Sequence, residues 1–505
     1  LGAGEGAGAG AGTAPMATPR AARGLPPPLR NTPARAGTAL LTSQGGNWTA
    51  PLMASATEGR WVVQPDPDWC SNGPALEADP SGLMRMAVVR GPLDSVGMPA
   101  DSVPKLLPFC SGIMTSSAHS LPVELAHLPL LLVEDVAAAV SRLGSHARSR
   151  FFGDVIGVTG SVGKTSMVAM LAGALHPLGV ASPMWQGTAL PLGVAAEMAC
   201  MPRDASCWIL EMAAEGMLTH ARLVRPSVAV VTSLASTPRP LHGSLERMAR
   251  KTSAIFSHMR WGGHAVLRRD MPNYTLIERV ARARGLHVLS YGDHEQADVS
   301  LVAAEHGQVR ALVQGEDVTF PLALPGRHMA VNALGVIATL RALELPLDVA
   351  LRQFADMQPL PGRGQRFQVA VQDGGQATVI DDSASANPES MQAALALLAQ
   401  APCAPNQRVA VLGDMLELGA EGPRRHLDLE QALLQAAVGR VMLHGPLMRG
   451  LHERLAPHTP SQWFETLESL DQALSRNLNA GDWVLVKGSA AMGFQIVVDR
   501  LRAFA

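Results

Sequence analysis

Short apolar runs alternate with segments of helical length through the chain after about residue 150. Buried strands are predicted at 155–158, 208–212, 227–234, 264–267 and 288–291, where Val, Ile and Leu dominate. A helix is predicted at 166–175, and a small β excursion at 309–313 and 318–324 precedes another helix at 328–343. Strands that alternate with helices predict a doubly wound, mainly parallel α/β sheet.

A second alternating block follows the segment 359–363, whose Pro-Leu-Pro-Gly-Arg sequence is typical of a linker. Strands are predicted at 378–380, 408–412, 440–443 and 483–486, with helices at 388–400 and 427–438. Asn387 is expected to cap the first of these helices, because Pro388 and Glu389 follow it. The block therefore predicts a second α/β domain.

The pattern is weak before residue 150, where only a strand at 130–133 and a helix at 136–143 are predicted. The first residues are rich in Gly and Ala and then in Pro and Arg, which favours a disordered leader over an organellar transit segment. The predicted division is a leader at 1–44, an N-terminal domain at 45–150, a central domain at 151–358 and a C-terminal domain at 359–505.

Composition excludes several classes of partner. A formal net charge of -2 and an aromatic content of 4% argue against nucleic acid. Five cysteines without a C-x-x-C pair indicate reduced thiols in a cytoplasmic protein. No apolar run approaches the ~20 residues that cross a bilayer, so no membrane partner is expected.

The segment 159–166 carries the clearest chemistry. A strand, a glycine turn and a helix start bring backbone N–H groups around one point, which makes an anion site. Lys164 supplies charge toward the outer phosphates of ATP, and the Thr165 hydroxyl can bind magnesium (Mg²⁺). The predicted ATP-binding residues are Thr159, Gly160, Ser161, Val162, Gly163, Lys164, Thr165 and Ser166. Val158 stands where a strict Walker motif has its first glycine, and Gly-Lys-Thr at the junction disfavours a turn that merely joins two elements.

Glu211 is the second candidate for the site. It ends the apolar strand 207–210, and ligands of open α/β sheets gather at the carboxyl ends of strands. A carboxylate there can hold magnesium facing the phosphates. The alternative is a solvated residue at a strand end, which the neighbouring phosphate site makes the weaker interpretation.

Six separated segments carry a family resemblance. They are 157–166, Gly326-Arg327-His328 with Asn332-Ala333, Pro361-Gly362-Arg363, Asp381-Asp382-Ser383 with 386–391, 411–419 and 486–489. In this order, over about 155–501, they resemble the Mur ligases, and within that family the members that add D-alanyl-D-alanine to UDP-N-acetylmuramoyl-tripeptide. The resemblance implies an α/β, three-domain architecture with an N-terminal substrate domain, a central P-loop ATPase sheet and a C-terminal Rossmann-like domain.

The resemblance also implies a reaction and its residues. Mur ligases form an amide through an acyl phosphate, with ATP cleaved to ADP and phosphate, and they serve peptidoglycan and cell wall synthesis. By resemblance, Lys164 and Glu211 are catalytic, and Thr165 and Glu211 reach magnesium. Asn332 and His328 are expected beside the adenine, and Arg363 and Asp381 near the nucleotide. For His328 and Asn332, helix capping or a polar helix face is the alternative that the residues alone favour. The expected partners are small-molecule carboxylate and amine substrates, with a UDP-linked peptide and a dipeptide as the candidates, and the protein is expected to be a monomer.

Several positions depart from the family pattern. The resemblance implies a carbamylated lysine and a histidine for a second magnesium, an asparagine pair, and a tyrosine and asparagine in the C-terminal motif; here these positions are Thr252, Pro238, Trp185-Gln186, Ala384 and Ser385. Lys251, one residue before Thr252, points about 100° away on a helix.

Three functional interpretations remain open. The chain is a ligase on the usual peptidoglycan precursor, a paralogue that joins a different carboxylate and amine, or a nucleotide-binding pseudo-ligase that acts as a partner protein.

Overall fold

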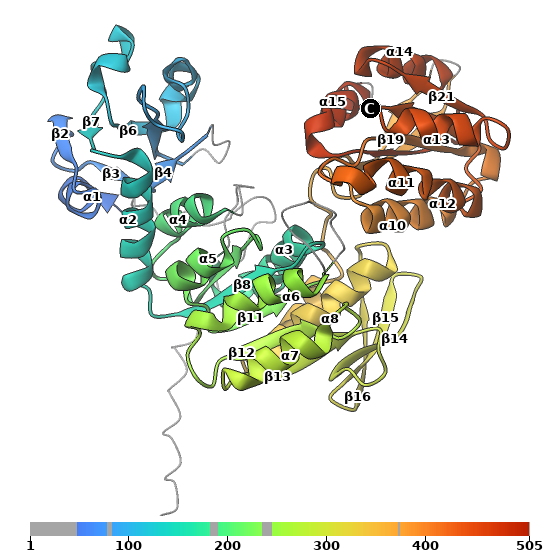
Figure 1. The fold of residues 1–505 in the computed structure, drawn as a ribbon, viewed down its shortest axis with the longest axis horizontal. Helices are drawn as coiled ribbons and strands as arrows, with labels where there is room; N and C mark the ends of the chain where they lie inside the picture. The colour runs from blue at the N-terminus through green and yellow to red at the C-terminus, as the bar shows by residue number, and fades with distance from the viewer. Residues whose placement is uncertain (1–47, 78–82, 182–189, 235–244, 372–373, 504–505) are drawn as a thin grey trace, which may run out of the picture. The chain divides into compact units, whose positions relative to one another are not determined.

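The computed structural model describes residues 48–77, 83–181, 190–234, 245–371 and 374–503. The predicted leader therefore lies outside the described residues. Three main sheets follow one another along the chain, one before residue 150, one in the middle and one after residue 360 (Figure 1). The predicted boundaries at 150 and 358 stay predictions.

The middle sheet has nine strands. In spatial order they are β16 (Glu316–Pro321), β15 (Gln308–Val313), β14 (Val299–Glu305), β13 (His287–Gly292), β12 (His264–Arg268), β11 (Val228–Val231), β8 (Asp154–Thr159), β10 (Cys207–Glu211) and β9 (Val180–Ala181). Pairing is parallel from β9 to β14 and antiparallel from β14 to β16. The predicted mainly parallel sheet is confirmed, although β9 and β14 were not predicted.

Helices cover both faces of this sheet. Strand side chains such as Ile156 and Ile209 share a core with α3 (Lys164–Leu175), α8 (Arg327–Ala342) and α9 (Leu347–Gln353). The opposite face carries α4 (Pro191–Cys200), α5 (Met217–Val224), α6 (Leu245–Ser253) and α7 (Tyr274–Ala283) (Figure 1). A Cβ on Gly335 of α8 would lie 2.5 Å from Met167 Cε and 3.0 Å from the Tyr291 ring, so glycine lets α8 lie close to α3 and β13.

The last sheet has six strands. Their order is β17 (Gln365–Ala370), β18 (Gln376–Asp382), β22 (Trp483–Lys487), β19 (Arg408–Gly413), β20 (Arg440–His444) and β21 (Ser461–Phe464). One face packs on α10 (Pro388–Ala399), α12 (Leu429–Gln435) and α13 (Met448–Leu455), and the other on α14 (Leu467–Asn477) and α15 (Phe494–Arg502).

Two predictions about this last block have distinct outcomes. The cap at Asn387 is confirmed, because its Oδ1 accepts a 2.8 Å hydrogen bond from Ser390 N. The helix predicted at 427–438 is wrong in its bounds: α11 (Gly422–Leu427) and α12 meet at Asp428, and α12 ends at Gln435. Ala437 adopts φ 48°, a left-handed conformation that stops a helix.

The first sheet has five strands, ordered β2 (Arg60–Val63), β7 (Leu130–Leu132), β6 (Cys110–Thr115), β5 (Arg85–Val89) and β4 (Pro74–Ala75). A separate pair, β1 (Trp48–Thr49) and β3 (Cys70–Ser71), lies beside α1 (Ala50–Thr57). The helix predicted at 136–143 continues to Ser149 as α2 (Val136–Ser149). All five cysteines are free thiols. Among the described residues, the model contains no helix with the length and apolar character of a bilayer span.

Candidate functional site: a glycine turn facing the C-terminal sheet

The glycine turn joins the end of β8 to the start of α3. Gly160 has φ 138° and Gly163 has φ 83°, both in the region that only glycine adopts readily. A Cβ on Gly160 would lie 2.2 Å from Thr232 Oγ1 and 2.8 Å from the Ser233 carbonyl oxygen. Glycine is therefore required at position 160 by both conformation and space.

Two residues at the carboxyl end of β11 hold this turn. Ser161 N donates to the Ser233 carbonyl at 2.7 Å, and the Thr232 hydroxyl donates to the Val162 carbonyl at 2.6 Å. Thr232 N also donates to the Thr159 carbonyl at 2.9 Å. The sequence placed both residues only in a predicted strand. The sequence signal that could have identified them as turn-holding residues was a pair of small hydroxyl residues at the end of an apolar run. The sheet places this run, as β11, beside β8.

A cavity of about 480 Å³ opens over the turn. It brings together most of the residues predicted for the nucleotide site: Ser161, Val162, Gly163, Lys164, Thr165, Ser166, Glu211, His328, Asn332 and Arg363. Thr159 and Gly160 do not line it, because they form the buried start of the turn. Residues of the C-terminal block, among them Asp382, Asn387 and Lys487, complete the wall.

The donor set at one side of the cavity suits magnesium. Glu211 pairs in register with Val158 at the end of β10, so its half-buried carboxylate lies beside the turn. Thr165 is in the first turn of α3, and its hydroxyl accepts a 3.5 Å contact from Arg363 Nη2. A hydroxyl and a carboxylate are hard oxygen ligands, which magnesium combines with phosphate oxygens. The magnesium ion itself stays a proposal.

The start of α8 lies against the same turn. Asn332 is buried, and its Oδ1 lies 3.7 Å from the position of a Cβ on Gly163. His328 lines the cavity and is exposed to solvent there. Its pKa is lowered, mainly by desolvation from the surrounding protein and further by Lys487 and Arg268, while Asp382 opposes the shift. The ring is thus favoured in its neutral form. The predicted contacts of both residues with adenine stay predictions.

Asp381 is engaged within the C-terminal block. Its Oδ2 accepts from Gly362 N and from Arg502 Nη2, both at 3.1 Å, and its Oδ1 accepts from the Ser383 hydroxyl at 2.6 Å. These bonds fix the linker turn that carries Arg363. The neighbouring Asp382, rather than Asp381, lines the cavity. The predicted approach of Asp381 to the nucleotide stays untested.

Lys487 is a site residue that the sequence showed only as part of a motif. It is 2% exposed, and its Nζ donates to Asp382 Oδ2 at 2.7 Å and to the Ser385 carbonyl at 2.8 Å. Burial lowers the pKa of this ammonium group, and the Asp382 carboxylate opposes the shift. A lysine directly after an apolar strand was the available signal.

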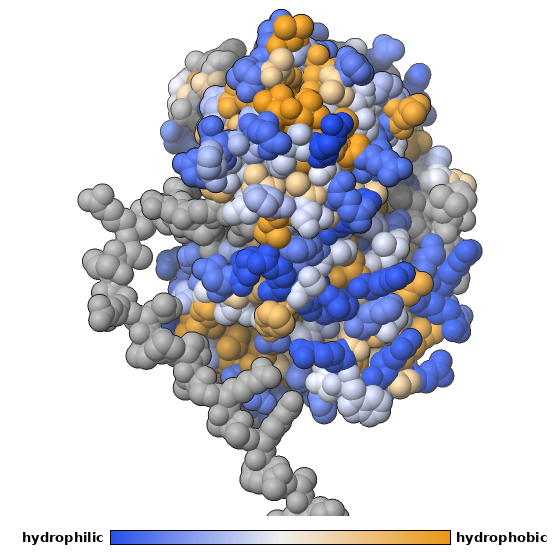
Figure 2. Space-filling view, turned by 90° about the vertical axis from the view of Figure 1, so that its left-hand side faces the viewer, coloured by the Kyte–Doolittle hydropathy of each residue, from blue (hydrophilic) through white to orange (hydrophobic). Residues whose placement is uncertain are grey.

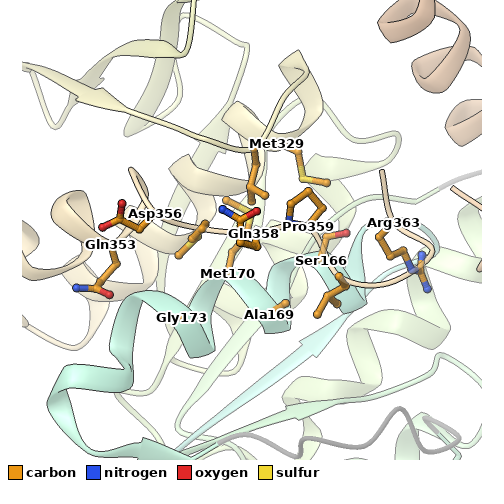
Figure 3. A pocket seen from close by; sticks show the side chains of 13 residues that line it. Ser166, Ala169, Met170, Gly173, Met329, Gln353, Asp356, Gln358, Pro359 and Arg363 are labelled. Carbon is orange, nitrogen blue, oxygen red and sulfur yellow. The ribbon is translucent and has the colours of Figure 1, made fainter. Parts of the chain in front are cut away.

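A smaller cavity of about 250 Å³ borders the turn (Figure 3). In Figure 3, Ala169, Met170 and Gly173 of α3 lie on one side of it, with Gln358 and Pro359 opposite. The smaller cavity shares Ser166, Met329 and Arg363 with the larger one, so the two adjoin. Its lining is mostly apolar; the polar and charged residues are Ser166, Gln353, Asp356, Gln358 and Arg363.

The departures from the family pattern have mixed outcomes. Thr252 is fully buried on α6, and its Oγ1 has no hydrogen-bond partner among the described residues. Ala384 N donates to the Gly362 carbonyl at 3.0 Å, so it belongs to the linker turn. Trp185, Gln186 and Pro238 lie outside the described residues.

Comparisons with known proteins agree on one family. The Mur ligase middle domain matches residues 158–340, and the Mur ligase glutamate ligase domain matches residues 365–490. The UDP-N-acetylmuramoyl-tripeptide–D-alanyl-D-alanine ligase of Synechocystis is 30% identical over 381 residues, which are 74% of this chain and 80% of the relative.

Solved structures share the fold. MurF of Acinetobacter baumannii superposes with a TM-score of 0.72 at 22% identity and covers 90% of this chain and 99% of its own. MurF of Thermotoga maritima, in complex with ADP, gives a TM-score of 0.65 at 20% identity, over 85% of this chain and 97% of its own. The three-sheet α/β architecture expected from the sequence is therefore confirmed.

Proposed function

Because the chain belongs to the Mur ligase family and is thus an ATP-dependent acid–amino-acid ligase, we propose that it adds D-alanyl-D-alanine to a UDP-muramoyl tripeptide. The observation that carries this choice is the 30% identity, over 80% of its length, to a relative with that printed activity. The three-sheet fold and the cavity over the turn support the same reaction class.

The proposed first step is phosphoryl transfer. An oxygen of the substrate carboxylate attacks the γ-phosphorus, the bond to the β–γ bridging oxygen breaks, and ADP leaves. Lys164 and the backbone N–H groups of the turn neutralise charge on the transferring group, which is most of what this chemistry requires. Thr165 and Glu211 would hold magnesium, which supplies further charge neutralisation at the phosphates.

The proposed second step is aminolysis. The amine attacks the carbonyl carbon of the acyl phosphate, inorganic phosphate leaves, and the amine loses a proton. Lys487 cannot accept that proton while its ammonium group bonds Asp382 and the Ser385 carbonyl. Those bonds instead fix the wall of the cavity that faces the turn, so we assign Lys487 and Asp382 a positioning role.

The smaller cavity is proposed as an alternative place for the adenine to the surroundings of His328 and Asn332, which line only the larger cavity. Its walls from α3 and the linker are largely apolar, and it adjoins Ser166 at the end of the phosphate-binding turn. A flat base fits such a lining better than a phosphate does. Met329, shared by both cavities, would contact the base next to the ribose.

In a second candidate function the ligase reaction is the same and the two substrates differ. Thr252 and Ala384 stand where the resemblance implies a metal-binding lysine and a tyrosine, and neither can replace those groups. These changes favour a paralogue that joins a different carboxylate and amine. They do not alter the turn, Lys164 or Glu211.

Substrate-dependent phosphate release separates the possibilities. The proposed function requires ADP and phosphate in equal amounts when ATP, magnesium, UDP-muramoyl tripeptide and D-alanyl-D-alanine are all present, and little when either acceptor or donor is omitted. Turnover with another acid–amine pair only would establish the paralogue. Nucleotide binding without turnover on any pair would indicate a pseudo-ligase acting as a partner protein.

A further inference from the structure

Arginines and exposed aromatic side chains gather at one edge of the nine-stranded sheet. This arginine edge consists of Arg150, Phe152, Arg203, Arg225, Arg260 and Trp261. Phe152 lies just before β8, Arg203 before β10, Arg225 before β11 and Trp261 before β12. The amino ends of parallel strands meet at one edge, while the glycine turn and Glu211 follow carboxyl ends. The arginine edge and the nucleotide site are therefore on opposite edges of the sheet.

The strand order sets the spacing of these residues. The sequence of neighbours is β12, β11, β8 and β10. Neighbouring strands are about 4.8 Å apart, so Trp261 and Phe152 precede strands that lie roughly 10 Å apart. Arg225, before the strand between them, lies in the middle of this row. Arg225 thus lies between the segments that carry the two aromatic residues.

Half-buried Arg148 links two segments of this row. Its guanidinium donates from Nε to the Val224 carbonyl at 2.6 Å, from Nη1 to the Phe151 carbonyl at 2.9 Å and from Nη2 to the Arg225 carbonyl at 3.1 Å. These bonds hold the segments that carry Phe152 and Arg225 in fixed positions. Arg148 therefore supports the edge from beneath and leaves the other arginines free to face solvent.

Positive charge dominates the surroundings of the arginine edge. Burial lowers the pKa of Arg148 to about 10, and the charges of Arg225 and Arg260 add to the shift. Burial likewise lowers the pKa of His146, with Arg150 and Arg203 as the next causes. Nearby like charges disfavour the charged form, so the shifts show that these arginines lie close to Arg148 and His146.

Few carboxylates offset these charges. Asp154 and Glu344 lie near His264, which is the first residue of β12 and follows Trp261 by three positions. Asp204 directly follows Arg203 in an exposed loop. Among the residues that the structure describes, Arg150, Arg203, Arg225 and Arg260 make no ion pair with a carboxylate. Most other arginines with exposed side chains, such as Arg282 and Arg310, do have such a partner.

The aromatic side chains are unusually exposed. Phe152 is 93% exposed and Trp261 is 84% exposed. The Trp261 ring is nevertheless held, because it lies over Gly285, where a Cβ would be 2.4 Å from a ring carbon. Figure 2 shows, on one face of the molecule, hydrophobic side chains among strongly hydrophilic ones. Large exposed aromatic rings beside unpaired cations mark an interaction surface.

We propose that the arginine edge docks the protein peripherally on an anionic membrane surface. Arginines attract anionic lipid headgroups, and Phe and Trp rings that project from loops enter the interfacial layer. An acidic polypeptide would satisfy the charges but gives no role to two rings directed into solvent. Docking of this kind needs no membrane-spanning segment. It is independent of the proposed ligase reaction and leaves the nucleotide edge facing the aqueous side.

Co-sedimentation with vesicles tests the proposal. The full chain is mixed with vesicles of phosphatidylcholine containing about one third phosphatidylglycerol, at a salt concentration where the Debye length is about 10 Å. We expect binding to these vesicles and not to pure phosphatidylcholine. Each arginine near such a surface contributes about 1 kcal/mol, so Arg225→Gln with Arg260→Gln should weaken binding roughly 25-fold. Trp261→Ala, which keeps every charge, should weaken it several-fold.

A matched control carries the same change of charge elsewhere. Arg424→Gln with Arg476→Gln removes two exposed arginines of the C-terminal block and should leave vesicle binding unchanged. An unchanged unfolding midpoint shows that each variant is folded. Equal losses in the two double variants, or no binding of the original protein to anionic vesicles, overturn the proposal. Tight binding of soluble polyglutamate that Trp261→Ala does not affect also overturns it, in favour of an acidic protein partner.

Discussion

The hydroxyl of Thr232 offers the sharpest test of how the turn is held. Thr232→Val keeps the shape of the side chain and removes the hydroxyl, which donates to the Val162 carbonyl at 2.6 Å and also lies 3.2 Å from the Thr159 carbonyl. Thr232 is 2% exposed, so water cannot easily replace the lost bond. The turn should then lose part of the geometry that presents its N–H groups to phosphate.

The size of the effect follows from one buried hydrogen bond. Such a bond contributes about 1–1.5 kcal/mol net, and an unsatisfied buried carbonyl costs somewhat more. If the bond is needed for the bound form of the turn, Thr232→Val should raise the Kd for ADP with magnesium roughly tenfold, since 1.4 kcal/mol corresponds to a factor of ten. Thr232→Ser retains the hydroxyl and should bind ADP nearly as tightly as the original protein.

Isothermal titration calorimetry with ADP and magnesium measures this difference directly. Thermal unfolding without nucleotide shows whether the variants are folded to the same extent. Unchanged ADP affinity in Thr232→Val would refute the assignment of Thr232 as the residue that holds the turn. Equal weakening in the valine and serine variants would show that shape rather than the hydroxyl matters.

Three further predictions concern space and charge. Gly160→Ala should abolish measurable ADP binding in calorimetry, because its Cβ would meet Thr232 Oγ1 at 2.2 Å and the residue would keep φ 138°. Gly144→Ala should lower the free energy of unfolding, measured in urea, by about 1–3 kcal/mol, because its Cβ would meet backbone atoms of Ala195 at 2.6 and 2.7 Å. Gly450→Ala is the control, because the atom nearest to its Cβ would be 3.7 Å away, and this variant should be as stable as the original protein or more stable. Burial lowers the pKa of His426, so the unfolded chain binds its proton first as pH falls, and stability should decrease below about pH 6.5. Urea unfolding of His426→Gln at several pH values should show a weaker dependence than the original protein, and an identical dependence would contradict the assignment.

Most of the fold could be predicted from local patterns in the sequence. The glycine turn, the strand before it and the helix after it are contiguous in sequence, so apolar periodicity and glycine spacing were sufficient to predict them. The Asn387 cap was predicted for the same reason, since its partner Ser390 is three residues away. Short strands at the edge of a sheet, such as β9, were not predicted, because a strand of two residues is too short to show a hydrophobic periodicity.

The parts of the site that the sequence missed depend on long-range contacts. The bond from Thr232 to Val162 joins residues 70 positions apart, and that from Lys487 to Asp382 joins residues 105 positions apart. No local pattern signals such pairs; only the strand order does, by placing β11 beside β8 and β22 beside β18. Asp381 and Asp382 show the same limit, because adjacent residues on a strand point to opposite faces and the sequence does not say which one faces the cavity.

We propose that the site over the glycine turn makes an amide through an acyl phosphate. Mass spectrometry of the phosphate released from substrate with heavy oxygen in its carboxylate tests this most directly. We expect one heavy oxygen in each inorganic phosphate and an equal amount of ADP, and we expect Lys164→Ala to abolish the formation of both. Unlabelled phosphate, release of AMP and pyrophosphate, or full turnover in Lys164→Ala would contradict it.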